Sequence, residues 1–136
     1  MRIMLDSGAY MPTRAHKNDA GIDIRTPKRI VIRPHDSVTV DTGVHIELPP
    51  DTVGMLKSKS GLNVHHDLVG EGVLDVGYTG SIRVKLYNLG GEMQILERGD
   101  KIIQLVVLPV LFPILEEVKQ LADTERGSNG FGSTGR

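Results

Sequence analysis

The residues best suited to chemistry lie within residues 72–82 (GVLDVGYTGSI), where one acid and one aromatic ring stand among glycines and apolar residues. Gly77 and Gly80 allow turn conformations that other residues resist, so the pattern predicts a β-hairpin with Asp75 and Tyr78 at its corner. Apolar and polar residues alternate from position 82 to position 87. This alternation predicts a second strand with one buried face.

Two interpretations of Asp75 are open at this point. As ordinary turn chemistry, Asp75 would cap its own backbone and Tyr78 would cover the edge of the core. As a functional group, the carboxylate would be partly desolvated by Val73, Leu74 and Val76. Desolvation would make it a better proton acceptor than a surface aspartate.

Asp23 and Gln104 are polar residues placed among apolar ones. Asp23 lies in residues 19–26 (DAGIDIRT), with the flanking isoleucines expected to face inward and the acid to face the opposite side. It would either satisfy backbone donors or act at a site. Gln104 interrupts an apolar strand, so its amide either pairs with backbone or faces a polar cavity.

Residues 58–63 (SKSGLN) could open a short helical turn in which backbone N–H groups and Ser60 bind an anion, with Lys59 adding positive charge. The alternative is a capped turn with a solvated lysine. His65 and His66 do not predict a metal site, because neighbours on a strand point to opposite faces and cannot easily share one ion.

The C-terminal residues 126–136 (RGSNGFGSTGR) combine glycines and hydroxyl side chains with a cation and a single aromatic ring. Such a segment is usually a flexible terminus. However, Arg126, Ser133 and Thr134 could bind phosphate oxygens while Phe131 stacks on a base. The pattern therefore favours a lid over a nucleoside phosphate, although it lacks the Gly-Lys-Ser/Thr ending of a Walker A loop.

The elements that must position these groups are short strands separated by Gly and Pro turns, with a loop over residues 6–18. This pattern predicts an all-β fold, a distorted jelly-roll β-barrel. Residues 101–109 are nearly continuous in apolar residues and are expected to be buried on both faces. The further expected strands are residues 1–5, 29–32, 37–40, 44–48, 52–57, 92–96 and 114–118.

Length and charge restrict the class of protein. A chain of 136 residues is expected to form one domain. With 16 basic and 17 acidic residues the net charge is -1, which gives no field to hold a nucleic-acid backbone. No cysteine, signal peptide or apolar stretch of membrane-spanning length is present, so we expect a soluble, intracellular (cytoplasmic) protein.

Taken together, these segments resemble the trimeric dUTP diphosphatases (dUTPases) across nearly the whole chain, in the family's motif order. The third and fifth matching stretches are specific, and the order and spacing of all five make coincidence improbable. The matching stretches are residues 20–24 (AGIDI), 59–62 (KSGL), 72–80 (GVLDVGYTG), 99–104 (GDKIIQ) and 126–135 (RGSNGFGSTG).

The resemblance implies a jelly-roll domain over residues 1–122 and a glycine-rich lid over residues 123–136. It also implies a homotrimer with shared active sites, each closed by the tail of a neighbouring chain. The implied reaction is hydrolysis of dUTP to dUMP and pyrophosphate with Mg²⁺, which limits uracil incorporation into DNA and supplies dUMP for dTMP synthesis.

The resemblance also assigns roles to residues. Asp75 would activate the water that attacks the α-phosphorus, Tyr78 would exclude a ribose 2′-hydroxyl, and Asp23 would hold water ligands of Mg²⁺. Phe131 would stack on uracil. The implied substrate-binding residues are Lys59, Ser60, Gly61, Gly72, Val73, Leu74, Tyr78, Gln104, Arg126, Phe131, Gly132, Ser133 and Thr134.

Two departures from the family pattern affect these roles. Lys59 stands where the family usually has arginine, which replaces a planar fork by a point charge. Val69 stands where many relatives have a polar residue, so base discrimination would rest more on the main chain.

Two alternative functions remain open. The first is a dCTP deaminase or bifunctional deaminase–diphosphatase, although Glu71 is the only obvious candidate for a deaminase glutamate near the predicted hairpin. The second is a nucleotide-sensing, partner-binding protein.

Overall fold

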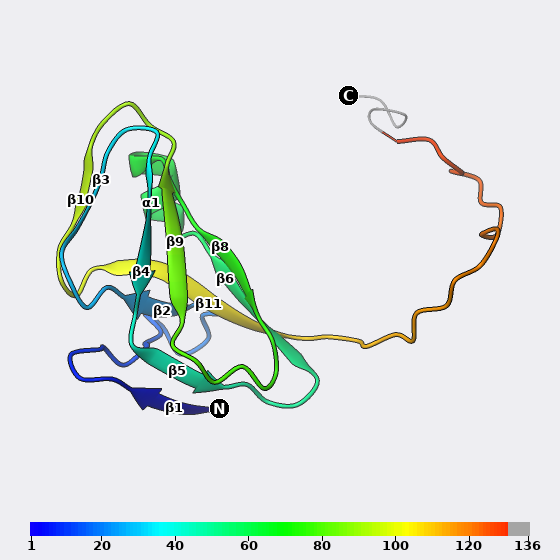
Figure 1. Cartoon of the computed structure of the whole chain (residues 1–136), viewed down its shortest axis with the longest axis horizontal. Coiled ribbons are helices and arrows are strands. Elements are labelled where there is room, and N and C mark those ends of the chain that lie inside the picture. Colours follow the sequence, from blue (N-terminus) through cyan, green and yellow to red (C-terminus); the bar gives the residue numbers. More distant parts are fainter. Residues whose placement is uncertain (131–136) are drawn as a thin grey trace.

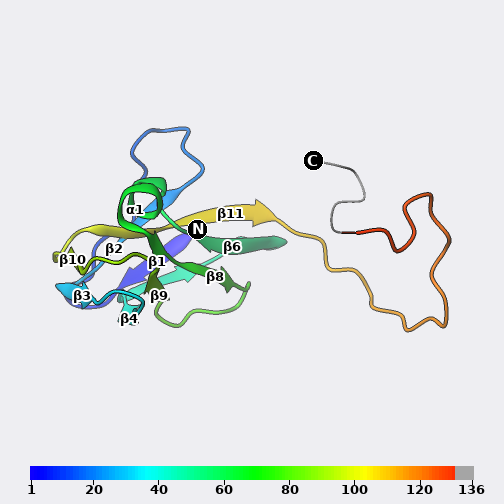
Figure 2. The same ribbon diagram turned by 90° about the horizontal axis from the view of Figure 1, so that it is seen from above.

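The computed structural model describes residues 1–130, which contain eleven β-strands and one helix. The strands wrap around one apolar core, and the chain after the last strand extends away from this body (Figures 1 and 2). The predicted all-β jelly-roll class is confirmed. Within the described residues, no helix has the length and apolar character needed to cross a bilayer.

A four-stranded antiparallel sheet carries most of the predicted site residues. Its order is β2 (Ile22–Arg25), β11 (Lys101–Pro109), β6 (Thr52–Lys57), β8 (Glu71–Leu74). Strand β11 pairs with β2 over Lys101–Leu105 and with β6 over Gln104–Pro109, and its first half is largely buried, as its apolar sequence predicted. Its far end is more open, since Leu108 is 47% exposed.

Three smaller antiparallel sheets complete the body. In the three-stranded sheet, β9 alternates buried and exposed residues along its whole length, as predicted. The remaining elements are β4 (Ser37–Asp41), β9 (Arg83–Asn88) and β7 (Leu68–Val69) in the three-stranded sheet, β1 (Arg2–Leu5) with β5 (Val44–Glu47), and β10 (Gln94–Leu96) with β3 (Ile30–Ile32).

The core is built almost entirely from β-branched and leucine side chains contributed by every sheet. Such residues pack well on pleated surfaces. Its most deeply buried members are Ile24, Ile32, Val40, Val44, Leu68, Ile82, Val84, Leu86, Ile102, Ile103 and Leu105.

The predicted hairpin over residues 72–82 is wrong in its pairing. Strand β8 pairs with β6, whereas β9 pairs with β4 and β7, so the two strands belong to different sheets. Residues 75–82 are a crossing loop between these sheets. The glycines marked the reversal correctly, but eight residues exceed a tight hairpin turn and allow the next strand to choose another partner.

Helix α1 (Ser60–His66) is longer than the expected turn. Its last turn contains His65 and His66, so the prediction that these residues lie on a strand is wrong. The helix ends at Asp67, which adopts a left-handed conformation (φ 52°) and donates its N–H to the carbonyl of Leu62. This C-terminal cap turns the chain directly into β7.

Residues 110–130 form an extended arm that contains no helix or strand, so the strand predicted over residues 114–118 is absent. The arm leaves the body after β11 (Figure 1). Its apolar side chains are open to solvent, with Leu111, Ile114 and Leu115 exposed by 89%, 97% and 91%. A single apolar segment has no strand to pair with in this chain, and this explains why the pattern did not produce a strand.

Candidate active site

One group of predicted site residues converges where β2, β11 and α1 meet. Gln104 lies opposite Asp23 in the β2–β11 register and opposite Lys57 in the β6–β11 register. Its amide Nε2 donates to the carbonyl of Ser58 at 3.1 Å. The alternative in which Gln104 pairs with backbone is therefore what the structure shows.

Asp23 is buried and contacts two lysines. Its Oδ1 lies 2.5 Å from Nζ of Lys59, and its Oδ2 lies 2.7 Å from Nζ of Lys101. Burial alone would raise the pKa of Asp23, but the hydrogen bonds from Lys101 and Lys59 outweigh it and hold the pKa below its ordinary value. This lysine–aspartate cluster, of Asp23, Lys59 and Lys101, carries a net charge of +1 from two ammonium groups and one carboxylate.

Gly21 packs closely against the side chain of Gln104, which lies opposite Asp23. A Cβ atom at position 21 would lie 2.2 Å from Oε1 of Gln104, well inside van der Waals contact. The glycine next to β2 therefore lets the Gln104 side chain lie over the backbone. This gives a physical reason for the Gly in the sequence AGIDI.

Ser60 and Gly61 open helix α1 beside the lysine–aspartate cluster, and both are exposed. The helix is capped at its N-terminus by the backbone of Lys59 without a side-chain hydrogen bond. A Cβ at Gly61 would meet no atom within 4 Å among those described. The surface at this end of α1 is therefore open.

The second group of predicted residues lies in the crossing loop 75–82. The N–H of Tyr78 donates to the carbonyl of Asp75 at 3.1 Å, and Gly77 has φ 92°, as a tight turn requires. Asp75 is exposed, and Val73 and Val76 are 58% and 44% exposed. The prediction that these valines desolvate the Asp75 carboxylate is therefore wrong within one chain, because they face outward from the sheet and the loop.

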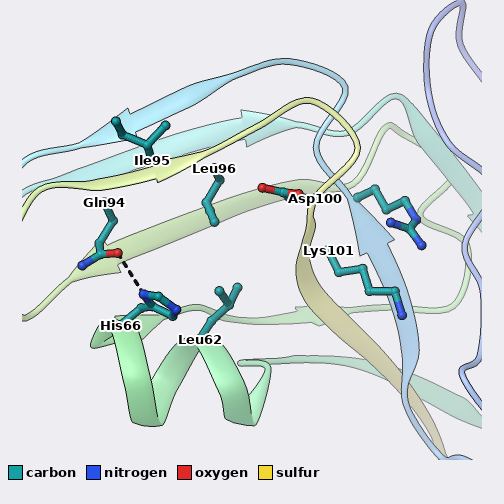
Figure 3. Close-up of a pocket in the computed structure, with 8 residues that line it drawn as sticks. Leu62, His66, Gln94, Ile95, Leu96, Asp100 and Lys101 are labelled. Carbon is teal, nitrogen blue, oxygen red and sulfur yellow. Dashed lines mark hydrogen bonds between the residues drawn. The ribbon is translucent and has the colours of Figure 1, made fainter.

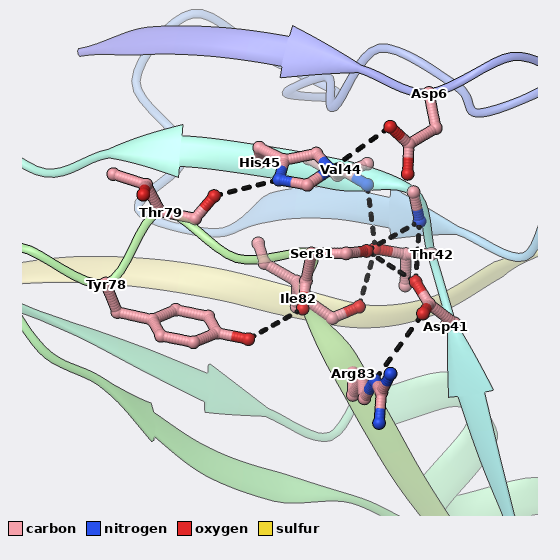
Figure 4. A network of polar contacts seen from close by, with 11 residues as sticks. Asp6, Asp41, Thr42, Val44, His45, Tyr78, Thr79, Ser81, Ile82 and Arg83 are labelled. Atoms are coloured by element: carbon pink, nitrogen blue, oxygen red, sulfur yellow. Dashed lines mark hydrogen bonds and ion pairs between the residues drawn. The ribbon is translucent and has the colours of Figure 1, made fainter.

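Tyr78 is held by two contacts of the same loop. Its hydroxyl donates to the carbonyl of Ser81 at 3.0 Å (Figure 4). Its ring also covers Gly80, where an added Cβ would lie 2.6 Å from the Tyr78 hydroxyl oxygen. Gly80 thus permits the close approach that fixes the ring, and it does so without a positive φ.

The loop is anchored to the β4–β5 connection (Figure 4). The N–H of Gly43 donates to the Ser81 hydroxyl at 3.0 Å, and the N–H of Ile82 donates to the carbonyl of Val44 at 2.8 Å. Nearer Tyr78, the carbonyl of Thr79 contacts Nδ1 of His45 at 2.8 Å. These bonds fix the C-terminal half of the loop, while the pairing of Leu74 with β6 fixes the start of the loop beside Asp75.

The two groups are far apart in a single chain. Leu74, the residue before Asp75, lies opposite Gly54 in the β6–β8 register. Ser58, which bonds Gln104, is four residues further along, or about 13 Å at about 3.3 Å per residue. One chain therefore does not bring Asp75 to the lysine–aspartate cluster.

In the described part of the tail, Arg126 is not brought to either group. The Nε of Arg126 donates to the carbonyl of Asn129 at 3.1 Å, in an exposed turn on the extended arm. The predicted residues Phe131, Gly132, Ser133 and Thr134 lie outside the described residues.

A cavity of about 430 Å³ lies between α1 and β10 (Figure 3), and Asp75 is not among the residues that line it. His66 closes one side through a contact of 3.1 Å between Nδ1 and Oε1 of Gln94. Lys101 lines this cavity and also contacts Asp23, so the cavity borders the lysine–aspartate cluster. Its lining residues are Arg25, Leu62, His66, Gln94, Ile95, Leu96, Asp100 and Lys101.

Sequence reasoning missed two charged residues near these groups. Lys101 stands inside the matching stretch GDKIIQ but had no assigned role. On β5, His45 lies between the buried residues Val44 and Ile46. This alternation predicts only that the His45 side chain faces away from the core, and it predicts no contact or role. Their partners, Asp23 and Thr79, are distant in sequence, so only the strand pairing could reveal them.

The structure is an all-β protein that carries two separate groups of polar residues, the loop with Asp75 and Tyr78 and the lysine–aspartate cluster. The dUTPase family model matches residues 8–135. The deoxyuridine 5'-triphosphate nucleotidohydrolase of Clostridium kluyveri is 40% identical, over 96% of this chain and 94% of that protein. The chain belongs to the dUTPase family.

Solved structures agree. A Staphylococcus bacteriophage 80alpha dUTPase with dUPNHPP superposes with a TM-score of 0.92 at 30% identity, covering 99% of this chain and 98% of that one. A dUTPase from phage phi11 of S. aureus has a TM-score of 0.81 at 29% identity, covering 88% and 96%. That structure is described as revealing the coordination of a structural Mg(II) ion.

Proposed function

We propose that the chain hydrolyses dUTP to dUMP and pyrophosphate, with Asp75 as the base that takes a proton from the attacking water. The observation that carries the proposal is the exposed Asp75 carboxylate in a loop that is anchored at both ends, by the β6–β8 pairing before it and by the hydrogen bonds of Ser81 and Ile82 after it. A fixed backbone orients a base toward a water without covalent chemistry. Family membership and the dUPNHPP-bound relative support dUTP as the substrate.

Uracil would be read by main-chain groups of residues 72–74. Strand β8 is an edge of its sheet, so one side of its backbone is free of strand partners among the described residues. Free N–H and C=O groups on an edge pair readily with a flat polar partner such as a base. Tyr78, fixed by Gly80 and Ser81, would pack under the deoxyribose and leave no room for a 2′-hydroxyl.

The triphosphate would bind at Lys59, Ser60, Gly61 and Gln104. The net charge of +1 at the lysine–aspartate cluster favours a polyanion there. The Ser60 hydroxyl is exposed and free to donate. Gln104 would have to keep or exchange its bond to Ser58 as phosphate arrives.

Mg²⁺ fits this site only together with the substrate. Within residues 1–130, no group of three or more His, Cys, Asp or Glu side chains is arranged to hold a metal. Asp23 has a single carboxylate, and both of its oxygens contact lysines, so it would have to share one of them with the water ligands of an ion that rides on the phosphates. When bound, Mg²⁺ would neutralise charge that develops on the phosphate oxygens.

The active site would be shared among the subunits of a homotrimer. Within one chain, Asp75 lies far from the proposed phosphate-binding residues. In the proposed trimer, another chain would supply the phosphate-binding residues that act with Asp75. The exposed apolar side chains of the arm support assembly, because a folded monomer rarely leaves so many leucines and isoleucines in solvent. Residues 1–122 would then form the barrel with its arm, and residues 123–136 a lid that brings Arg126 and Phe131 over a neighbour's nucleotide.

The experiment is a measurement of pyrophosphate release from dUTP, dCTP, dTTP and UTP with Mg²⁺, with products separated by chromatography. We expect rapid release from dUTP and little from the other three. Conversion of dCTP to a uracil nucleotide would instead indicate deamination. Tight dUTP binding without pyrophosphate would indicate a nucleotide sensor and overturn the proposal.

A further inference from the structure

His45 on β5 bridges the crossing loop and the segment after β1. Its Nδ1 lies 2.8 Å from the carbonyl oxygen of Thr79, and its Nε2 lies 3.2 Å from Oδ1 of Asp6 (Figure 4). The side chain is 17% exposed, and Nε2 is buried and makes no hydrogen bond to any described residue, so its contact with Asp6 is electrostatic. We name these three residues, His45, Asp6 and Thr79, the His45 clamp.

Both partners of the imidazole are acceptors. The Thr79 carbonyl and the Asp6 carboxylate offer only lone pairs, and a neutral imidazole carries a single N–H. With the proton on Nδ1, the Nε2 lone pair would face a carboxylate oxygen at 3.2 Å inside the protein. With the proton on Nε2, the Thr79 carbonyl would face a lone pair instead. Only the imidazolium both donates to the Thr79 carbonyl and places positive charge beside the Asp6 carboxylate.

The charges around His45 favour this protonated form. Asp6 faces it from the segment after β1, and Asp41 at the end of β4 adds a second negative charge, partly satisfied by Arg83 at 3.5 Å. Arg2 and Glu47, which line a cavity of about 370 Å³ together with His45 and Thr79, pair with each other. The Thr79 carbonyl, then Asp6, raise the pKa of His45 above its ordinary value of 6.5, against the opposing effect of burial.

The His45 clamp holds the loop at the point closest to the proposed catalytic groups. Thr79 follows Tyr78 directly, whereas the other anchors act at Ser81 and Ile82. Loss of the Thr79 contact would leave Tyr78 tied only to its own loop, through Ser81. The position of the sugar-binding ring therefore depends on two anchors, His45 at Thr79 and the β4–β5 connection at Ser81.

We propose that protonated His45 is a positioning residue, which fixes Thr79 and through it Tyr78, so that affinity for the nucleotide falls as the imidazolium loses its proton. This inference rests on the proposed function for its kinetic consequence. The clamp itself exists whether or not the chain hydrolyses dUTP, and the two parts are tested separately.

The first test follows the His45 ring by NMR across pH 5 to 9 in the full chain, without substrate. We expect a titration midpoint above 6.5, a drop in that midpoint in Asp6→Asn, and a Thr79 amide signal that shifts with the same midpoint. A His45 midpoint at or below 6.5 in the wild type, or one unaffected by Asp6→Asn, would overturn the clamp. This result does not depend on turnover.

The second test compares KM and kcat for dUTP in the wild type and in His45→Gln. We expect the variant to raise KM by about tenfold at pH 6, the effect of one lost hydrogen bond to a charged group, with a smaller change in kcat. As pH rises through the His45 midpoint, the wild-type KM should climb toward that of the variant. An equal KM for both proteins at pH 6 would overturn the positioning role.

Two further variants distinguish a role of His45 in positioning Thr79 from a general loss of protein structure. His45→Lys keeps a permanent cation within reach of Asp6 and should flatten the rise of KM with pH. His35→Asn, at an exposed left-handed position (φ 59°) that asparagine tolerates, should behave as the wild type. A wild-type pH profile of KM in His45→Gln would show that another group titrates and would defeat the proposal.

Discussion

The Nζ of Lys101 lies 2.7 Å from Oδ2 of Asp23, while the other oxygen of the same carboxylate contacts Lys59. The three charged groups come from β2, from β11 and from the residue before α1. One buried acid thus ties together the central sheet and the entrance of the helix. Removal of the acid would leave two ammonium groups facing each other without an intervening charge.

We therefore expect Asp23→Asn to lower the free energy of unfolding by roughly 1–3 kcal/mol at pH 7, the range for a partly buried ion pair that loses one partner. Urea unfolding at a fixed protein concentration measures it. Asp51→Asn is the matched control, because Asp51 is exposed and has φ 55°, which asparagine accepts. Equal loss in both variants would contradict the role of the cluster.

The same cluster predicts how stability depends on acid. The folded-state pKa of Asp23 is below its ordinary value of 3.8, so its stabilisation is present above that value and is lost as pH falls through the lower folded pKa. The difference in unfolding free energy between wild type and Asp23→Asn should hence shrink below about pH 4. A difference that stays constant from pH 7 to pH 3 would be inconsistent with this linkage.

Asp75→Asn tests the proposed base. The side chain is exposed and makes no described side-chain hydrogen bond, so thermal stability should change little. Loss of a general base typically reduces turnover by about 10²–10⁴-fold, whereas nucleotide binding should persist. Isothermal titration with dUpNHpp and pyrophosphate release from dUTP measure the two quantities. Turnover near that of the wild type would remove Asp75 from the mechanism.

Sequence periodicity predicted the strands well because β9 and the first half of β11 each have a clear burial pattern. Sequence periodicity did not predict which strands pair with one another. The alternation in residues 72–87 does not say that β8 pairs with β6 and β9 with β4, since an eight-residue loop permits either arrangement. The apolar pattern of residues 114–118 likewise predicted a strand although one chain offers no partner for it.

Of the candidate site, sequence reasoning identified the residues but not their surroundings. Asp23 and Lys59 were assigned separate roles, and their ion pair appears only when β2 is placed beside α1. Desolvation of Asp75 was inferred from apolar neighbours in sequence, yet Val73 points outward from an edge strand. The burial of a side chain depends on the residues that pack over it in the folded chain, and these cannot be identified from its neighbours in sequence.

Gly80→Ala tests how Tyr78 sets sugar selectivity. The added methyl would lie 2.6 Å from the Tyr78 hydroxyl oxygen and must displace the ring. We expect the preference for dUTP over UTP, as a ratio of kcat/KM, to fall by about tenfold, since exclusion of one hydroxyl by a shifted ring loses on the order of 1–2 kcal/mol. Gly91→Ala, where nothing described lies within 4 Å, is the control. An unchanged ratio in Gly80→Ala would show that the position of the Tyr78 ring does not determine the preference for dUTP over UTP.

The exposed arm gives the last prediction. Ile114 and Leu115 are 97% and 91% exposed, so they contribute nothing to the core of their own chain. The double substitution Ile114→Asp with Leu115→Asp should leave the barrel folded but place charges where a neighbouring subunit would bury apolar side chains. We expect light scattering to report monomers and dUTP hydrolysis to fall sharply, because Asp75 then lacks the phosphate-binding residues of another chain.

The matched control for the arm is Glu116→Ala with Glu117→Ala, which changes two exposed polar residues of the same segment. This variant should remain trimeric and active, because it removes charge from the arm and adds none. If the doubly charged variant also stays trimeric at micromolar concentration, the arm is not the assembly surface. The shared-site model would then need a different contact between chains to bring Asp75 to the lysine–aspartate cluster.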